Sequence, residues 1–151
     1  MTEEASRIKR FDYDNLFKSV LKEYFWDALR IFLPALYNVA DKNVPPKFLD
    51  NELKKVTFDL EGGANRSDML AEIKLMDGGN ELVLCHLEVQ GEGGDDLPTR
   101  MMRYRDAIHL HYKKEPVGIA VITAQRPQDE KTFYSSDMFG VTVSYIYVNF
   151  F

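Results

Sequence analysis

The sequence predicts an α/β fold (an α+β mixed sheet), in which helices flank strands that run both parallel and antiparallel. Three patterns predict it. Apolar residues recur at helical spacing from Leu16 to Leu33, two alternating segments meet at the glycine turn 77–80, and an almost uniformly apolar segment, 117–123, follows a second amphipathic segment. A tight turn joins antiparallel strands, whereas a helical crossover leads to a parallel strand, so the sheet is expected to be mixed.

Length and composition fit one globular domain. The 151 residues are 45% hydrophobic, which is enough to build a core, and we expect a flexible lead over 1–11 and a single domain over 12–151. The single cysteine, Cys85, cannot form an internal disulfide and is expected in the core. No secretory signal begins the chain and no apolar segment approaches the ~20 residues that span a bilayer, so we expect a cytoplasmic protein without membrane contact.

The first element is expected to be a long amphipathic helix that starts at Leu16. Its apolar positions form one broad stripe, which packing on a core explains. Asp12 or Asp14 can cap the N-terminus, because a carboxylate there accepts backbone N–H groups. Pro34 marks a kink or the start of the helix end.

A linker and a first strand are expected next. Residues 38–51 contain Asn, Asp and a Pro-Pro pair, which favour a turn or an extended linker. A strand is expected within Leu53–Leu60, because Val56 and Phe58 share a face and Gly62-Gly63 ends the segment.

The strongest pattern is a β-hairpin with strands 68–76 and 81–90 around Asp77-Gly78-Gly79-Asn80. Alternation produces matching apolar sets, which are Met69, Ala71, Ile73 and Leu75 on one strand and Val83, Cys85, Leu87 and Val89 on the other. If both sets share a face, Asp68 lies opposite Glu88, give or take two residues, because a one-residue slip would turn one set outward. A three-residue loop with a left-handed glycine would give that register.

The second half of the chain supplies a helix and two strands. Leu97-Pro98 opens a helix that runs to about Lys114, with its apolar side formed by Met101, Tyr104, Ile108 and Tyr112. A buried strand over Val117–Thr123, a loop over 124–140 and a last strand over Val141–Phe150 follow. The expected order is helix, three strands, helix, strand, strand.

Acidic residues gather where the central strands of the sheet are expected. Asp68 on one strand faces His86, Glu88 and Gln90 on the other. Buried carboxylates are unfavourable unless they are paired or bind a cation. Two carboxylates, a backbone carbonyl such as that of Val89 and waters would suit Mg²⁺, or Mn²⁺, which can activate water against a phosphodiester. The alternative interpretation is a solvated sheet face, where alternating polar residues are common.

Net charge restricts where a nucleic acid could bind. The formal charge of −5 opposes phosphate binding, so the positive charge must be local. The candidate basic face is 97–114, which carries Arg100, Arg103, Arg105, Lys113 and Lys114. The histidines lack zinc-like spacing, and the Gly-Gly pairs lack the spacing and Lys-Ser/Thr of a phosphate loop, which excludes P-loop nucleotide hydrolysis.

In combination, five motifs resemble the PD-(D/E)XK nuclease superfamily, and within it the recombination-promoting nuclease or transposase (Rpn-like) family. These are Asp14-Asn-Leu-Phe-Lys18, Arg66-Ser-Asp68-Met-Leu, His86-Leu-Glu-Val-Gln-Gly91, Pro98-Thr-Arg-Met-Met-Arg-Tyr104 and Phe139-Gly140 before an aromatic-rich strand. The resemblance spans residue 12 to the end. It implies a restriction-endonuclease-like core of order α-β-β-β-α-β, here with an extra C-terminal strand.

The resemblance also implies roles for individual residues. Asp68 matches the metal-binding Asp and Glu88 the acidic residue of the E-x-K element, while Gln90 stands where the lysine usually lies. The family is similar in placing Gln there, and Gln can orient water but carries no charge. Lys18 or Lys74 is a hypothetical substitute for that lysine.

Other matched positions are candidates for the metal site or for phosphate. Asp14 either completes the metal site or caps the first helix. Arg66, Arg100 and Tyr104, together with Lys18, are candidate phosphate or DNA contacts, and packing under the helix is the alternative for Tyr104.

The expected function is a Mg²⁺-dependent DNA endonuclease in recombination or mobile-element biology, as the resemblance implies. The alternative is a catalytically inactive nuclease-like module that binds nucleic acid or a protein partner. Family members usually continue beyond the strand that ends here at Phe150, so a truncated or short variant is expected. Assembly into a homo-oligomer stays open.

Overall fold

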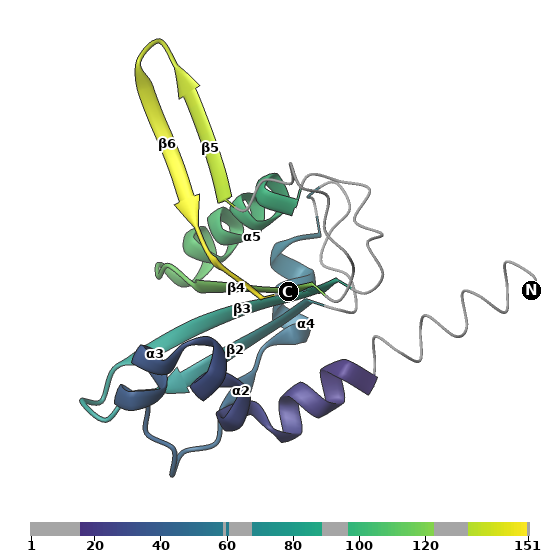
Figure 1. Cartoon of the computed structure of the whole chain (residues 1–151), viewed down its shortest axis with the longest axis vertical. Helices are drawn as coiled ribbons and strands as arrows, with labels where there is room; N and C mark the ends of the chain where they lie inside the picture. The colour runs from purple at the N-terminus through teal and green to yellow at the C-terminus, as the bar shows by residue number, and fades with distance from the viewer. Residues whose placement is uncertain (1–15, 59, 61–67, 89–96, 123–132, 151) are drawn as a thin grey trace, which may run out of the picture.

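A five-stranded mixed sheet organises the chain (Figure 1). The computed structural model describes residues 16–58, 60, 68–88, 97–122 and 133–150. The strand order is β1-β2-β3-β4-β7: β1 pairs antiparallel with β2 and β2 with β3, whereas β3 pairs parallel with β4 and β4 with β7. The predicted mixed sheet with flanking helices is therefore confirmed.

The N-terminal helix is interrupted twice. The break before Pro34 is the kink or helix end that we predicted, whereas the break at Tyr24 was not predicted. Residues 16–23 are helical, Tyr24 forms a turn, and α2 spans Phe25–Phe32. Backbone hydrogen bonds from Tyr24 to Val20 and from Ala28 to Tyr24, each 2.9 Å, continue across the first break. Leu33 leaves helical geometry because a following proline disfavours it, and Pro34 begins the short helix α3, Pro34–Val39.

The strand predicted within Leu53–Leu60 is wrong, because the helix α4 occupies Asp50–Val56. Leu53 and Val56 pack with the core cluster at helical rather than alternate spacing. Acidic residues in the first turn and lysines in the last turn also favour a helix through its dipole. The first strand lies earlier, as the two-residue β1, Lys47–Phe48.

The central hairpin is confirmed, with β2 at Asp68–Lys74 and β3 at Asn80–Glu88. Its register is the two-residue limit of the prediction: Asp68 pairs with His86, not Glu88. The loop has the three residues expected, 76–78, because the Leu75 amide donates to the Gly79 carbonyl at 2.8 Å and the Gly78 amide donates to the Leu75 carbonyl at 3.0 Å. Gly78 supplies the expected positive φ, 91°.

The crossover from β3 to β4 runs through α5, Leu97–Tyr112, as predicted. β4, Val117–Ile122, pairs in parallel with β3 from Val83↔Val117 to Glu88↔Ile122. The ends of both strands therefore lie beside each other at one edge of the sheet.

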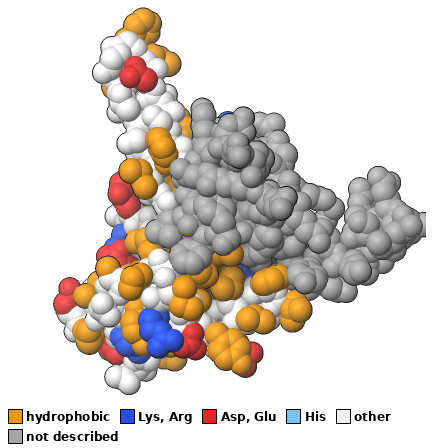
Figure 2. Space-filling view, in the orientation of Figure 1, with side chains coloured by type: hydrophobic (Ala, Val, Ile, Leu, Met, Phe, Trp, Pro, Cys, Tyr) orange, Lys and Arg blue, Asp and Glu red, His pale blue; other side chains and the backbone are white. Residues whose placement is uncertain are grey.

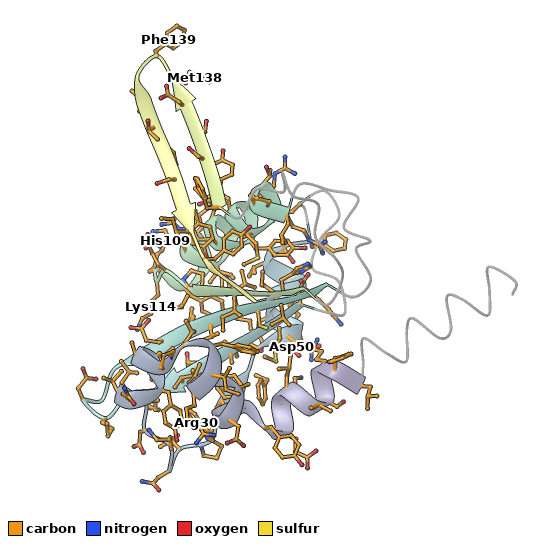
Figure 3. The ribbon with its side chains drawn as sticks, in the orientation of Figure 1. Arg30, Asp50, His109, Lys114, Met138 and Phe139 are labelled. Carbon is orange, nitrogen blue, oxygen red and sulfur yellow. The ribbon has the colours of Figure 1, made fainter. Side chains whose placement is uncertain are left out.

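A second, two-stranded sheet projects from the body (Figure 1). The loop predicted over 124–140 is wrong in part: 123–132 lie outside the described residues, but β5 spans Phe133–Met138. The last predicted strand divides into β6, Val141–Ile146, which pairs with β5, and β7, Val148–Phe150, which joins the main sheet. Figure 2 shows hydrophobic side chains at the tip of this hairpin and at separate places along it, between atoms of other kinds, and Figure 3 shows Met138 and Phe139 at its tip.

Both faces of the main sheet are packed. The predicted apolar face, with Met69, Ala71, Ile73, Val83 and Cys85, packs against Phe25 and Leu29 of α2. The opposite face, with Leu70, Leu82, Leu84 and Ala120, packs against α4 and α5. Within the described ranges no helix combines the length and apolar character needed to cross a bilayer.

Candidate functional site

The candidate site is centred on Asp68, the first residue of β2. Its carboxylate is buried, with the whole residue 2% exposed, and its strand partner His86 is 4% exposed. Asp68 Oδ1 lies 2.5 Å from His86 Nδ1. The solvated sheet face that we considered as an alternative is therefore wrong for both residues, because α5 covers this end of the sheet.

Helix α5 brings a permanent positive charge to the buried carboxylate. Arg100 Nη2 donates to Asp68 Oδ2 at 3.2 Å, and Arg100 Nε donates to the Tyr104 hydroxyl at 3.0 Å. Burial by itself would lower the pKa of Arg100, but the Asp68 charge and the contact with Tyr104 more than offset it, and the net pKa is raised. Arg100 therefore stays protonated and neutralises Asp68.

Tyr104 lies on the buried side of α5 and is 2% exposed, which agrees with the packing role that we considered as the alternative for this residue. Burial and then the Asp68 charge raise the pKa of Tyr104 to about 12. The phenol therefore keeps its proton at neutral pH, and its hydroxyl holds the Arg100 guanidinium by accepting the Nε hydrogen bond. We assign Tyr104 to positioning Arg100.

Lys18 reaches the site from the helical segment 16–23. Its Nζ donates to the backbone carbonyl of Asp68 at 3.1 Å and lies 3.0 Å from Asp50 Oδ2. Only 14% of the Lys18 side chain is exposed. These contacts attach the first helix to the start of β2, so Lys18 supports the site from behind rather than presenting a free ammonium group to solvent.

The other predicted site residues are described incompletely. Asp14, Arg66, Val89 and Gln90 lie outside the described residues, so their roles stay predictions. For Glu88 the backbone alone is described: it ends β3, two residues beyond His86, and pairs with Ile122.

Lys74 is in the wrong place to substitute for a catalytic lysine. It ends β2 beside the hairpin loop, six residues from Asp68, which is roughly 20 Å along an extended strand. Its side chain is exposed. Of the two lysines considered as substitutes, Lys18 alone contacts the site among the described residues.

The basic face predicted over 97–114 is partly neutralised. Arg100 points to Asp68, Arg105 contacts Asp106 at 2.9 Å and also Glu115, and Lys114 lies 3.9 Å from Glu81. Arg103 has an exposed side chain without an ion pair to a described carboxylate. The remaining positive charge is therefore smaller than the sequence suggested.

The donor chemistry of Asp68 fits a hard divalent cation. His86, Arg100 and the Tyr104 hydroxyl all contact this carboxylate, so a divalent cation would take the place of one of these partners. Within the described part of the chain, however, no three His, Cys, Asp or Glu residues form a metal-binding group. A complete ligand set would need Glu88 and the Val89 carbonyl, the two positions implied by the resemblance.

Two residues of the site were not assigned from the sequence. His86 was placed on the right face but received no role, although its place within two residues of the predicted Asp68 partner could have identified it. Asp50 was missed because it fell at the end of the predicted linker 38–51, before a segment that was predicted as a strand and is the helix α4. Its carboxylate would have been noticed at a helix N-terminus, where acidic residues are favoured.

No protein-family model matches this chain, and neither the curated proteins nor the solved structures that were searched contain a significant match. The resemblance to the nuclease family therefore depends on the five motifs alone.

Proposed function

We propose that this chain is a metal-dependent deoxyribonuclease whose active site lies where β2 begins and β3 ends. One observation carries the proposal: a buried aspartate, Asp68, stands at the edge of the sheet formed by the ends of the parallel strands β3 and β4, and cationic side chains from two helices converge on it. Sites in α/β sheets recur outside the carboxyl ends of parallel strands. The motif resemblance supports the same location.

Each residue then has a chemical task. Asp68, Glu88 and the Val89 carbonyl would hold Mg²⁺ or Mn²⁺, which supplies an activated water and neutralises charge on the phosphate when bound. Gln90 would orient the attacking water through its amide. Arg100 would contact the phosphate, and Tyr104 and Lys18 keep Arg100 and the start of β2 in place.

Cleavage of supercoiled plasmid in Mg²⁺ or Mn²⁺ tests the proposal. We expect nicking by the wild type, no nicking in EDTA, and a loss of at least ~100-fold in rate for Asp68→Asn and Glu88→Gln, which remove charged ligands. Glu72→Gln is the matched control, because Glu72 lies on the same strand four residues away. Nicking that persists in both site variants would show that another site, or a contaminant, cuts the DNA.

A nuclease-like module that binds DNA without cutting it is the second candidate. The observation that favours it is that Asp68 is neutralised by Arg100 and contacted by His86 within the protein. Such a module would retard DNA in EDTA as well as in Mg²⁺ and would leave plasmid intact. The electrophoretic shift and the cleavage assay on one preparation distinguish the two.

A further inference from the structure

Arg100 contacts Asp68 in a way that allows it to leave. Strong arginine–carboxylate pairs are bidentate, with two parallel N–H donors on two carboxylate oxygens. Here Nη2 alone is directed at Asp68 Oδ2, at 3.2 Å, while Nε is directed at Tyr104. The guanidinium is therefore divided between two partners, and its hold on Asp68 is weaker than a bidentate pair would be.

Tyr104 keeps Arg100 in the neighbourhood even when Asp68 releases it. The two residues are one helical turn apart on α5, and the guanidinium carbon lies 5.4 Å from the centre of the Tyr104 ring. The arginine side chain is 20% exposed, whereas that of Asp68 is 0% exposed. Arg100 can thus turn outward while its Nε remains on the hydroxyl, and Asp68 cannot follow it.

A divalent cation would compete with Arg100 for the same carboxylate. Both are positive, and a guanidinium and a metal ion on one carboxylate repel each other strongly in a buried site. The carboxylate, by contrast, needs a cation at all times, because an unpaired buried charge is unfavourable. Exchange of one cation for the other satisfies both conditions.

We propose that Arg100 is the internal counterion of Asp68 in the metal-free protein and is displaced from it by a divalent cation, which releases Arg100 toward the substrate phosphate. The inference rests on the proposed function, because it takes Asp68 as a metal ligand. It deepens that function by making metal entry and presentation of the phosphate-binding arginine a single event. Arg100 thereby lowers the affinity for metal, and metal makes Arg100 available.

Calorimetric titration of Mn²⁺ into the DNA-free protein tests the proposal without using activity. We expect Arg100→Gln to bind Mn²⁺ at least about tenfold more tightly than the wild type, since a neighbouring charge changes the proton affinity of a carboxylate by a similar or larger factor. Arg103→Gln, on the same helix but exposed, should bind like the wild type. Asp68→Asn should abolish the binding.

The outcomes separate this inference from the proposed function. Binding that needs Asp68 but is unchanged or weaker in Arg100→Gln overturns the displacement and leaves the metal site standing. Absence of Asp68-dependent binding in the wild type and in Arg100→Gln overturns both.

A second measurement uses the wild-type protein and therefore tests the proposal even if Arg100→Gln does not fold. In the wild type, the guanidinium NMR signal of Arg100, assigned with Arg100→Lys, should shift on addition of Mg²⁺, whereas that of Arg103 should not. An Arg100 signal that stays unchanged at saturating Mg²⁺ overturns the proposal.

Discussion

Asp50 connects three segments of the chain through one carboxylate. Its Oδ2 lies 3.0 Å from Lys18 Nζ and 2.6 Å from Lys22 Nζ, and its Oδ1 accepts the Leu70 amide at 3.2 Å. Figure 3 shows Asp50 between the first helical segment and the sheet. Because Lys18 also holds the carbonyl of Asp68, the carboxylate of Asp50 indirectly supports the candidate site.

The charge of Asp50 should make stability depend on pH. Burial alone would raise its pKa, but hydrogen bonds and charges from Lys22 and Lys18 outweigh burial, so the pKa is lowered below its ordinary value of 3.8. A lowered pKa stabilises the fold fully above the unfolded-state value, and this contribution is lost as the pH falls through the folded-state value. Asp50→Asn should therefore lower the free energy of unfolding by roughly 2 kcal/mol at pH 7, and by much less near pH 3.

Urea denaturation at the two pH values measures this difference. Asp27→Asn is the matched control, because Asp27 lies on the neighbouring helix α2 with 66% of its side chain exposed and a loose 3.7 Å contact to Arg30. Its free energy of unfolding should change little at either pH. If Asp50→Asn has the same free energy of unfolding as the wild type at pH 7, the proposed role of Asp50 is contradicted.

At the scale of elements, β4 depends on a glycine where strands and helix meet. A Cβ at Gly118 would lie 2.5 Å from the Tyr145 hydroxyl oxygen, 3.0 Å from Tyr147 Cβ and 3.1 Å from Met101 Cε. The Tyr145 hydroxyl is itself buried without a hydrogen-bond partner among the described residues. The Tyr145 hydroxyl thus occupies the space that a side chain at residue 118 would need.

Gly118→Ala should destabilise the protein by about 1–3 kcal/mol, because the interior cannot absorb the added methyl group without movement. Tyr145→Phe should be neutral or slightly stabilising, because it removes a buried hydroxyl that has no hydrogen-bond partner in the described part of the chain. In the double variant, the cost of Gly118→Ala should shrink, since the closest contact is gone. Thermal or urea unfolding of the wild type, the two single variants and the double variant measures the four free energies of unfolding. If the effects of the two substitutions add, this account of the contact is contradicted.

At the scale of the whole molecule, the sheet is held by packing on both faces rather than by a metal. One core cluster joins β2, β3 and β4 to α2, and the other joins them to α4 and α5. The buried charge of Asp68 is compensated by Arg100 inside the protein. The fold should therefore not require a divalent cation, even if the function does.

Removal of metal tests this independence. After dialysis against EDTA, the circular dichroism spectrum and the thermal midpoint should match those of untreated protein. Added Mn²⁺ should then raise the midpoint by mass action, because it binds the folded state. A loss of helical signal in EDTA would instead make the cation a structural component and would contradict the compensation by Arg100.

Local patterns were sufficient for the main elements of the fold. The hairpin of β2 and β3, the helix α5 and the buried parallel strand β4 follow from alternation, helical spacing and glycine placement, which neighbouring residues determine among themselves. The site was predicted in part for the same reason. Asp68 starts a strand, and its predicted partner, Glu88, lies two residues from the observed partner, His86. The short α4 was mistaken because a few apolar residues fit both periods.

The sequence by itself determined the mixed sheet, its central hairpin and the presence of an acidic residue at its edge. Only the tertiary structure decided that Asp68 is buried, that its cation is Arg100 from 32 residues away, and that Lys18 approaches from 50 residues away. The physical reason is that burial and ion pairing depend on which surfaces pack together. Which surfaces pack together depends on a small difference between large packing and solvation energies summed over the whole chain. A local pattern of apolar residues does not reveal that difference.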